Sequence, residues 1–378
     1  MGFLSGLEKV NHFVLARCTS AAVLLKRVKV AVDISPTIGD HRVRGIGTYT
    51  EQLVSQFKKG KWQIDFDFFK DPKSPPPTDI IHHPYFDLFF HTLPIRKTAL
   101  RVVTIHDVIP LLFPKYFPRG IKGNIDLFLQ KKALKNVDAV ICDSQTSRRD
   151  IVAQLSFPND KIHVVYLAAG QNFKKITSRQ SLGKVAKEFK LFSKFVLYVG
   201  DVNWHKNIET LLQAVKIARV NLVLVGSAFQ NKYLPQTVSI DQKINKLGLY
   251  HRIIKTGYVQ QKELVTLYNL AHVTLLPSFY EGFGLPVLES MACGTPVICS
   301  KVASLSEIGG KVAIFCDPKD PKEIAAKINF VFHFKKDQRE KLSYDCQKHA
   351  SAFSWEKVAS QTISIYKSVP KSSDATIP

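Results

Sequence analysis

Short apolar runs alternate with helical patterns along most of this chain of 378 residues, and they form two series. The first series has runs typical of buried strands at 28–34, 63–69, 79–83, 100–105, 138–142 and 163–166. The second series has such runs at 195–199, 221–225, 253–256, 273–276 and 296–299. Strands that alternate with helices form parallel sheets with helices on both faces. The sequence therefore predicts an α/β fold with two doubly wound, Rossmann-like domains that face a cleft.

A polar, basic stretch at 171–190 separates the two series and has the composition of a linker. We therefore expect a first domain over 28–180 and a second over 191–350, a division that suits the length of the chain. A last helical pattern, from Ser354 to Tyr366, predicts a C-terminal helix within 351–370. Ligands of doubly wound sheets bind at the carboxyl ends of the strands, so functional residues are expected there.

The first 27 residues, 1–27, form a predicted N-terminal extension. Its apolar segment, 13–25, is interrupted by Arg17 and is followed by Lys26 and Arg27, whereas a signal peptide has its charges before the apolar core. Two interpretations stay open: an amphipathic helix that lies on a membrane or on the protein, and a disordered or mis-started leader. No run of about 18 uncharged apolar residues occurs, so no transmembrane helix is predicted.

The chain has 53 Lys and Arg residues against 31 Asp and Glu residues, a formal net charge of +22. A positive field of this size attracts polyanions, which include nucleic acid, anionic membranes and phosphorylated substrates. Charge alone does not choose among them, and a lysine-rich surface on an otherwise ordinary fold is a further alternative.

The six cysteines have no CxxC spacing and no neighbouring histidine cluster. Cys142, Cys293, Cys299 and Cys316 lie in apolar or glycine-bounded runs, where cysteine behaves as a small apolar residue. We therefore expect a reducing compartment, without a zinc site or disulfides. The predicted location is cytoplasmic, with peripheral attachment to the inner face of the cell membrane as a further hypothesis.

The segment 275–300 combines a strand, a glycine-bearing loop, a short helix and a second strand. Gly282 and Gly284 let the loop backbone approach a ligand closely. Pro286 is placed to begin the helix, and Gly294 to end it in a left-handed cap. The free amides and the dipole at such a helix start favour an anion, for example a diphosphate.

Two glutamates flank this helix start. Glu281, in the loop, can accept hydrogen bonds from sugar hydroxyls, and Glu289, one turn into the helix, can accept them from ribose hydroxyls. A nucleotide-sugar carries such hydroxyl pairs at both ends. For each glutamate alone, an ordinary strand–helix–strand unit with a solvated carboxylate is the better explanation, but the combination favours a binding site.

The segment from Glu281 to Glu289 resembles the E-x7-E signature of retaining family 4 glycosyltransferases, which have the GT-B fold. The resemblance implies that Glu281 lies near the donor sugar and that Glu289 binds the ribose. It also implies that the backbone amides of Phe283, Gly284 and Leu285 face the sugar and the phosphates.

A second match is the segment 198–207, which resembles the strand–glycine loop of the family after Gly200. In the family, a lysine of this loop pairs with the donor diphosphate, and Lys206 is the matching residue. Many members carry an arginine directly after the glycine and another before the lysine, where this chain has Asp201 and His205. Without these two arginines, Lys206 is expected to act on the diphosphate together with His205 or with an arginine from elsewhere in the chain.

Several weaker matches complete the resemblance, which covers about residues 28–366. Gly47 belongs to a segment similar to the N-terminal glycine loop of the family, and His106 matches the strand-end histidine that faces the donor sugar. Tyr258 and Val259 match the loop that packs on the base. The helix that begins near Ser354 matches the one that crosses back to the first domain.

The resemblance also implies the chemistry. The stretch 110–114 after His106 looks most like mannosyltransferase-type members, so GDP-mannose is the first candidate donor, with UDP-sugars behind it. The expected acceptor is a glycan or a lipid-linked glycan in polysaccharide biosynthesis. The implied reaction retains configuration without metal or cofactor, through Lys206, Glu281 and His106, and no carboxylate base is assigned.

Two other classes compete with this hypothesis. Metal-dependent GT-A enzymes hold a divalent ion with an Asp-x-Asp pair, and Asp65 and Asp67 match that string inside an alternating strand. A second Rossmann-like half is not expected in that class. The other competitor is a basic nucleic-acid- or membrane-binding protein without catalysis, which explains the charge but not the glutamates and Lys206. Nucleic acid is therefore not an expected partner.

A basic helix predicted over 121–134 suggests how an enzyme could use the charge. Basic and apolar residues fall on or beside it: Lys115, Phe117, Arg119, Lys122, Ile125, Leu127, Phe128, Leu129, Lys131, Lys132 and Lys135. This composition is typical of a helix that docks on an anionic membrane surface, and a solvated basic face is the alternative.

Overall fold

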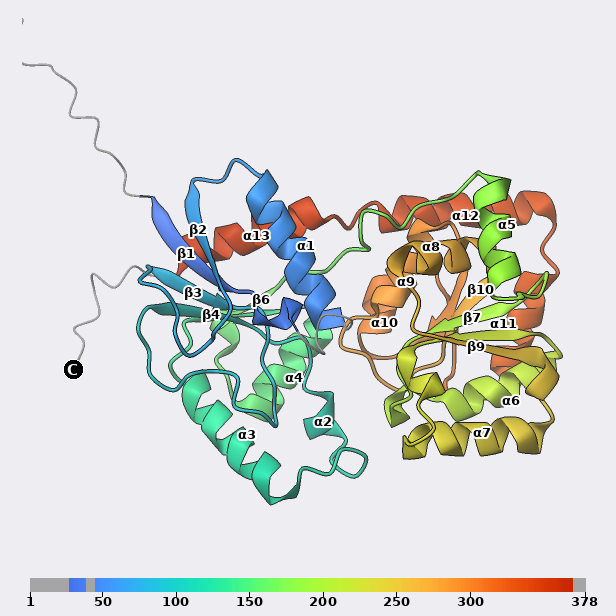
Figure 1. Cartoon of the computed structure of the whole chain (residues 1–378), viewed down its shortest axis with the longest axis horizontal. Coiled ribbons are helices and arrows are strands. Elements are labelled where there is room, and N and C mark those ends of the chain that lie inside the picture. The colour runs from blue at the N-terminus through green and yellow to red at the C-terminus, as the bar shows by residue number, and fades with distance from the viewer. Residues whose placement is uncertain (1–26, 39–44, 370–378) are drawn as a thin grey trace, which may run out of the picture.

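The computed structural model of the chain describes residues 27–38 and 45–369, which form two lobes side by side (Figure 1). Each lobe contains a six-stranded sheet between helices, with strand orders β2-β1-β3-β4-β5-β6 and β12-β11-β10-β7-β8-β9. Neighbouring strands in both sheets pair in parallel. The predicted α/β fold with two doubly wound sheets is therefore confirmed, and the single-sheet GT-A alternative does not fit.

The first lobe begins with a strand that is apolar and buried, because both faces of the sheet are covered. Its elements are β1 (Val28–Asp33), the turn η1 (Ser35–Thr37), α1 (Gly45–Lys59), β2 (Ile64–Phe69), β3 (Ile80–His83), β4 (Leu100–Thr104), α2 (Ile109–Leu112), α3 (Gly120–Leu134), β5 (Ala139–Cys142), α4 (Gln145–Leu155), η3 (Asn159–Lys161) and β6 (Ile162–Val164).

The second lobe repeats this alternation. Its elements are α5 (Arg179–Glu188), β7 (Val196–Val199), η4 (Trp204–Lys206), α6 (Ile208–Ala218), β8 (Leu222–Val225), η5 (Ser227–Gln230), α7 (Pro235–Leu247), η6 (Tyr250–Arg252), β9 (Ile253–Gly257), α8 (Gln261–Leu270), β10 (Val273–Leu276), α9 (Leu285–Ala292), β11 (Val297–Ser300), α10 (Ala303–Gly309), β12 (Ile314–Cys316), α11 (Pro321–Phe332) and α12 (Lys336–Ala350).

The expected linker at 171–190 differs from the prediction, because helix α5 lies within it. Ser178 caps this helix by accepting a hydrogen bond from the amide of Ser181. Val185 and Phe189 pack against the apolar cluster of the second lobe, beside α8. No residue of α5 is fully buried and most of its residues are polar or basic, so its composition resembles that of a linker although one face is apolar.

The last helix, α13 (Trp355–Ser368), returns to the first lobe and packs against α1 (Figure 1). Ser354 caps its start, as the sequence pattern indicates, and Tyr366 hydrogen-bonds to His82 inside the first lobe at 2.6 Å. The predicted crossing helix is therefore present. Of the predicted extension 1–27, all but Arg27 lies outside the described residues.

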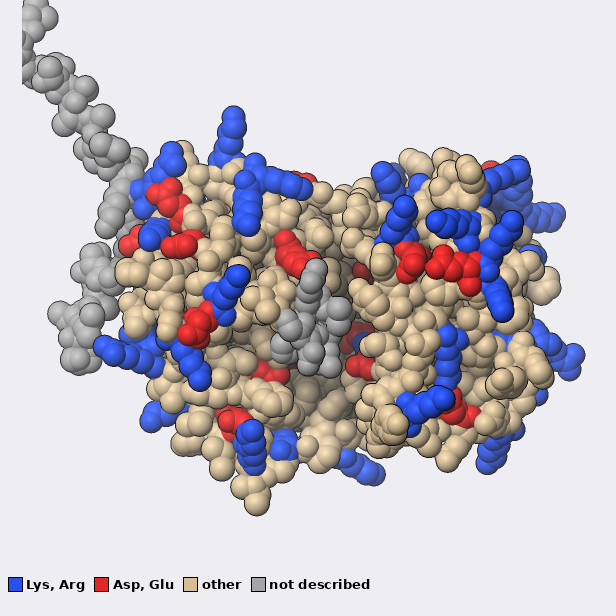
Figure 2. Space-filling model, in the orientation of Figure 1, with Lys and Arg blue, Asp and Glu red and all other residues tan. Residues whose placement is uncertain are grey.

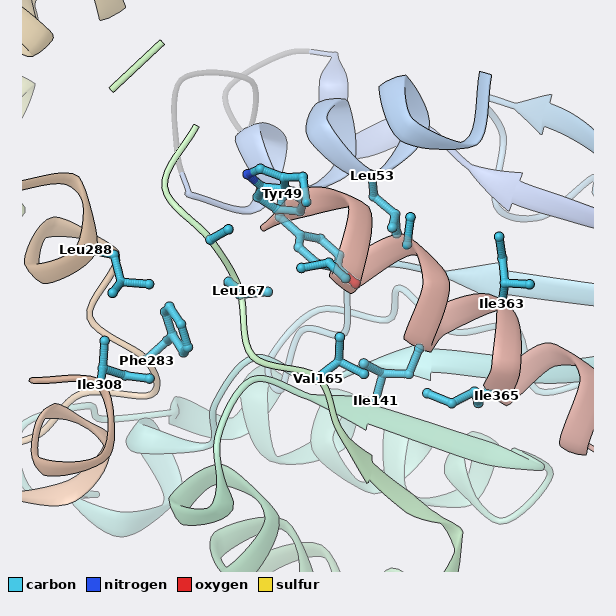
Figure 3. Close-up of a cluster of buried hydrophobic side chains, with 14 of the residues drawn as sticks. Tyr49, Leu53, Ile141, Val165, Leu167, Phe283, Leu288, Ile308, Ile363 and Ile365 are labelled. Atoms are coloured by element: carbon cyan, nitrogen blue, oxygen red, sulfur yellow. The ribbon is translucent and has the colours of Figure 1, made fainter. Parts of the chain in front are cut away.

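One apolar cluster extends through both lobes. Tyr49, Val165 and Leu167 of the first lobe belong to it, together with Phe283 and Leu288 of the second (Figure 3). A shared cluster of this kind stabilises the closed arrangement of the lobes by removing apolar surface from water at their contact.

Lys and Arg side chains project from the periphery of both lobes, on either side of the furrow between them (Figure 2). Among the described residues, no helix has the length and apolar character needed to cross a membrane.

Candidate active site

The loop after β7 is held rigidly at the carboxyl end of the second sheet. Asn207 has a left-handed backbone with φ of 56°, which asparagine tolerates. Its buried side-chain amide donates to the carbonyls of Pro277 at 2.8 Å and Pro318 at 2.7 Å. The carbonyl of His205 accepts from the amide of Phe279 at 2.7 Å. These bonds orient Lys206, the last residue of η4.

Lys206 and Glu281 form a two-point ion pair, because the ammonium Nζ lies 2.8 Å from each carboxylate oxygen. The hydroxyl of Ser278 donates to the same carboxylate at 2.7 Å. Burial alone would raise the pKa of Glu281, but the charge of Lys206 and the hydrogen bonds from Lys206 and Ser278 together outweigh it, and the pKa lies below its ordinary value. Glu281 is therefore ionised at neutral pH, as a buried acceptor paired with its cation.

The backbone before α9 is arranged so that its amides are available to a ligand. The hydroxyl of Ser304 donates to the carbonyls of Glu281 at 2.8 Å and Phe283 at 3.0 Å. Gly284, with φ of 99°, turns the chain into the helix. Among the described residues, the amides of Phe283, Gly284 and Leu285 have no hydrogen-bond partner. Unpaired amides at a helix start bind anions such as phosphate groups.

Glu289 lies on α9, where its carboxylate accepts a hydrogen bond from the Tyr268 hydroxyl at 2.8 Å. Burial raises the pKa of Glu289 to about 7, and the Tyr268 hydrogen bond offsets only part of that effect. At neutral pH this side chain is thus divided between the carboxylate and the carboxylic acid.

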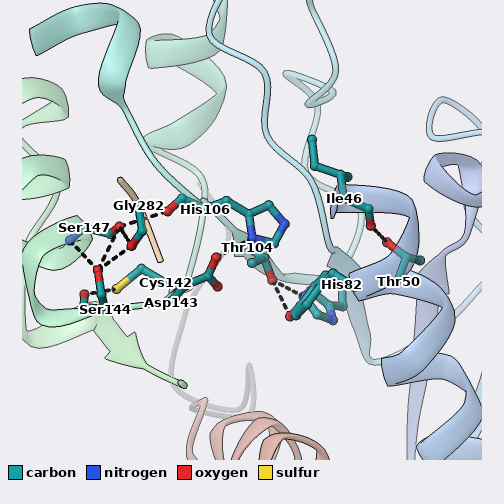
Figure 4. A network of polar contacts seen from close by, with 11 residues as sticks. Ile46, Thr50, His82, Thr104, His106, Cys142, Asp143, Ser144, Ser147 and Gly282 are labelled. Atoms are coloured by element: carbon teal, nitrogen blue, oxygen red, sulfur yellow. Dashed lines mark hydrogen bonds and ion pairs between the residues drawn. The ribbon is translucent and has the colours of Figure 1, made fainter. Parts of the chain in front are cut away.

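The first lobe supplies His106 at the carboxyl end of β4. Its Nδ1 lies 2.7 Å from a carboxylate oxygen of Asp143 (Figure 4). Tyr49 packs edge-on to its ring, with ring centroids 4.8 Å apart. The buried Nε2 has no partner among the described residues. Burial lowers the pKa of His106, but the charge and hydrogen bond of Asp143, together with Asp107 and the Pro84 backbone, raise it above its ordinary value. Asp143 therefore orients the ring and favours its protonated form.

His205 does not supply a second positive charge at this site. Burial and the neighbouring Lys206 lower the pKa of His205 to about 4, so its ring is neutral at pH 7. Its Nδ1 is buried without a partner among the described residues. The prediction that His205 assists Lys206 as a cation is therefore not supported by its environment.

The two lobes contact each other at the loop between β10 and α9, residues 277–284. We call this loop, which contains Glu281, the donor loop. The carbonyl of Gly282 accepts hydrogen bonds from the hydroxyls of Ser144 at 2.7 Å and Ser147 at 3.1 Å (Figure 4). The hydroxyl of Ser147 also lies 2.9 Å from the carbonyl of His106. A Cβ atom added to Gly282 would lie 2.7 Å from the Cβ of Asp107, closer than real side chains approach. His106 and Glu281 are thereby brought to one site.

A second contact between the lobes joins α10 to α4. The carboxylate of Glu307 accepts from the amides of Gln145 and Thr146 at 2.9 Å, and from the Thr146 hydroxyl at 2.6 Å. A negative charge at a helix start is stabilising, so Glu307 caps α4 from the other lobe. Sequence reasoning missed Glu307, Ser147 and Asp143, because their partners are distant in sequence. Ser144, which caps α4 by accepting from the amide of Ser147, is the one residue of this contact with a local signal, because serine before a helix is a common cap.

Four further predicted residues occupy different settings. Gly47 lies in the first turn of α1 rather than in a loop, which corrects that part of the prediction. Val259 is buried and Tyr258 is exposed, directly after β9 at the carboxyl edge of the sheet. Gly200 ends β7 at the same edge.

Asp65 and Asp67 lie on β2, and each has a basic neighbour. Asp65 pairs with Arg27 at 3.5 Å, and Asp67 with Lys29 at 3.7 Å. These carboxylates thus take part in surface ion pairs along the sheet, outside the site that contains Lys206.

Comparisons with known proteins agree with this geometry. The family described as "Glycosyl transferases group 1" matches residues 184–349, and the one described as "Glycosyltransferase Family 4" matches 76–168. O-antigen chain mannosyltransferase B of Escherichia coli is 32% identical over 295 residues, which cover 75% of each chain. The serotype-specific mannosyltransferase WbdA of Escherichia coli is 25% identical over 77% of this chain and 36% of its own length.

Sucrose-phosphate synthase from Thermosynechococcus elongatus has a similar structure, with a TM-score of 0.70 at 21% identity, over 90% of this chain and 98% of that one. This likeness shows the shared GT-B fold. Together with the sequence relationship and the matched families, it shows that the chain is an enzyme that belongs to the family 4 glycosyltransferases and is similar to their mannosyltransferases.

Proposed function

We propose that the enzyme transfers mannose from GDP-mannose to a glycan or lipid-linked glycan during polysaccharide biosynthesis, with retention of configuration. The observation that carries the proposal is the set of unpaired amides at 283–285 beside the Lys206–Glu281 pair. The names of the related mannosyltransferases favour mannose over other hexoses. A solved structure of similar fold that contains UDP-glucose keeps UDP-sugars as the second candidates.

In the proposed mechanism, the diphosphate of the donor lies against the start of α9. Lys206 then turns from Glu281 toward the phosphate oxygens and stabilises the charge that develops as the bond to the sugar breaks. The anomeric carbon becomes oxocarbenium-like, and the acceptor hydroxyl attacks from the side that the diphosphate leaves. The departing phosphate takes the acceptor proton, so no carboxylate base is needed.

His106 and Glu281 hold the sugar in this proposal. The Nε2 of His106 forms a hydrogen bond with a hydroxyl of the donor sugar, and the carboxylate of Glu281, relieved of part of its contact with Lys206, accepts from another. Glu289 accepts from the ribose, while Tyr258 and Val259 pack on the base. Closure of the lobes over the donor excludes water from the reacting carbon.

A thermal-shift screen with GDP-mannose, other GDP-sugars, UDP-sugars and ADP-sugars tests the proposed donor. A ligand that binds the folded state raises its stability by roughly 2.7 kcal/mol at a hundred times its Kd. We expect the largest rise in unfolding temperature with GDP-mannose. A rise with UDP-sugars alone would mean that the donor is a UDP-sugar and not GDP-mannose. No rise with any nucleotide-sugar would contradict the proposed donor site.

We also propose that α3 attaches the enzyme to anionic lipid at the inner face of the cell membrane. Ile121, Ile125 and Phe128 follow one another along one face of α3 and are 83%, 55% and 68% exposed. Lys122 and the lysines at the end of the helix flank this stripe. Leu127, expected in the stripe, packs instead into the core. An exposed apolar face with flanking cations suits a membrane surface of negative charge.

Flotation with vesicles tests this attachment. We expect binding to vesicles that contain phosphatidylglycerol, weaker binding to purely zwitterionic vesicles, and a clear loss in Phe128→Ser. Phe330→Ser is the matched control, because Phe330 is 59% exposed on α11 of the second lobe. Equal flotation of the two variants would contradict the role of α3.

A further inference from the structure

A cleft of about 930 Å³ opens between the lobes, apart from the donor site. It lies next to the loop at 200–206, which contains Lys206 and which we call the catalytic loop. From the first lobe, Phe89 and residues 115–118 line it. From the second lobe, its walls are the loop 202–204, the start of α6, the start of α7, and Phe279. In Figure 1, α6 and α7 run along the lower side of the second lobe, and their ends nearest the first lobe face the α2–α3 connection. Glu281, Glu289 and the amides at 283–285 are not part of the lining.

Aromatic rings form the wall nearest to the catalytic loop. Tyr116 of the first lobe stacks on Trp204 of the second, with ring centroids 3.6 Å apart and an interplanar angle of 6°. Phe117 and Phe279 line the cleft beside them. Aromatic faces bind the C–H faces of sugar rings, because such faces are apolar and weakly positive while the ring face is negative.

Helices α6 and α7 add polar side chains that are free to bind. Gln213 on α6 and Gln236 and Ser239 on α7 line the cleft. Within the described part of the chain, these three side chains have no hydrogen-bond partner. Amide and hydroxyl groups both donate and accept hydrogen bonds, as recognition of sugar hydroxyls requires.

The charge of the lining is nearly balanced, in a protein whose net charge is +22. Its charged side chains, among the described residues, are Lys115 and Glu209. A phosphate-rich or nucleic-acid ligand would be expected at a wall with several cations. A balanced wall with aromatic and amide groups instead suits a neutral ligand that has many hydroxyls.

From these observations we propose that the cleft binds a neutral oligosaccharide, namely the part of the acceptor glycan behind the sugar that is extended. Its volume falls in the range of about 300–1,000 Å³ that ligand sites occupy, and sites of this kind lie between domains. Because Trp204 precedes Lys206 by two residues, the bound glycan contacts the loop that stabilises the leaving diphosphate. This inference rests on the proposed transferase function and specifies its acceptor.

Saturation-transfer NMR with the full chain tests the cleft directly and needs no turnover. The probes are tetrasaccharides of mannose, glucose and N-acetylglucosamine. We expect at least one to bind, and the double variant Gln213→Ala, Gln236→Ala to weaken its affinity about tenfold, as the loss of two hydrogen bonds predicts. The matched control is Gln242→Ala, an exposed glutamine on α7 that does not line the cleft.

Activity gives the second measurement. For the double variant, the ratio of kcat/KM with the tetrasaccharide to kcat/KM with the methyl glycoside of its terminal sugar should fall about tenfold. Gln242→Ala should keep the ratio of the wild-type enzyme. Binding of none of the probes, or equal binding by the double variant, would overturn the proposal. Tetrasaccharide binding without nucleotide-sugar binding would support the cleft and contradict the proposed function, so the two failures are distinguishable.

Discussion

Lys206 and Glu281 are 75 residues apart in the sequence, yet their side chains meet at 2.8 Å. The pair has two consequences for the chemistry. The cation is neutralised by a buried carboxylate in this structure, and in the proposed mechanism a donor diphosphate becomes its second anionic partner. Since His205 is neutral, Lys206 is the cation of this loop that can compensate the leaving group.

Replacement of Lys206 by alanine should lower kcat by about 10²- to 10³-fold, the usual cost of one electrostatic contact to a transition state. The change also leaves Glu281 buried without its cation, so the unfolding temperature should fall as well. Lys206→Arg keeps a cation and can form the ion pair again, so it should recover much of both the unfolding temperature and the activity. Lys216→Ala, on the exposed face of α6, is the matched control. Full activity of Lys206→Ala at an unchanged unfolding temperature would contradict the mechanism.

Glu289 makes the stability of the fold depend on pH. Its pKa is raised from 4.5 to about 7, so the folded protein holds this proton more tightly than the unfolded chain does. The carboxyl therefore destabilises the fold increasingly as pH rises from about 4.5 to about 7, by up to roughly 3 kcal/mol in all.

Glu289→Gln removes that dependence. We expect the variant to gain unfolding temperature relative to the wild-type protein at about pH 8, and to show little or no gain at about pH 5, where Glu289 is protonated. Melting curves at the two pH values measure this. An equal difference at both would mean that Glu289 keeps an ordinary pKa.

At the scale of elements, the starts of two helices organise the site. The start of α9 has unpaired amides, which we propose bind the donor, and α4 is capped by Glu307 of the other lobe. Ser144 and Ser147, at the start of α4, hold the carbonyl of Gly282. Helix α4 therefore links closure of the lobes to the shape of the donor loop.

Glu307→Gln should weaken this link, because an uncharged side chain caps a helix less well by about 1 kcal/mol. We expect kcat to fall by several-fold, with a smaller change in donor affinity, since Glu307 lies outside the donor site. Enzyme kinetics and donor titration measure the two effects. Glu323→Gln is the control, because Glu323 lies in the first turn of α11 and serves its own lobe. Equal kinetic effects of both substitutions would show that the contact between the lobes is unimportant.

At the scale of the whole molecule, closure depends on one close backbone approach. The Gly282→Ala side chain would collide with Asp107 across the lobes. We expect the variant to open, with a larger radius of gyration in X-ray scattering and little transferase activity. Gly183→Ala on α5 is the matched control, because a Cβ atom there meets open space. A scattering profile like that of the wild-type protein, with full activity, would argue that the closed contact is not needed.

Local patterns in the sequence were sufficient for the α/β class, the two sheets and the helix start between Glu281 and Glu289. Each depends on neighbours along the chain: apolar runs bounded by glycines, Pro286 near a helix start, and a strand leading into Gly200. Helix α5 was not predicted, because its apolar residues do not depend on neighbours along the chain. Val185 and Phe189 are explained only by their packing against the apolar cluster beside α8.

Tertiary structure alone decided how the parts work together. The sequence marked Lys206, Glu281 and His106 singly, by resemblance and position. The fold determined that Lys206 is paired and that His205 is neutral, because pKa values depend on burial and on charges brought close in space. It also determined that Glu307 caps a helix of the other lobe, and that the cleft beside Trp204 is lined from both lobes. Contacts between lobes leave no periodic trace in either segment, which is why only the folded chain shows them.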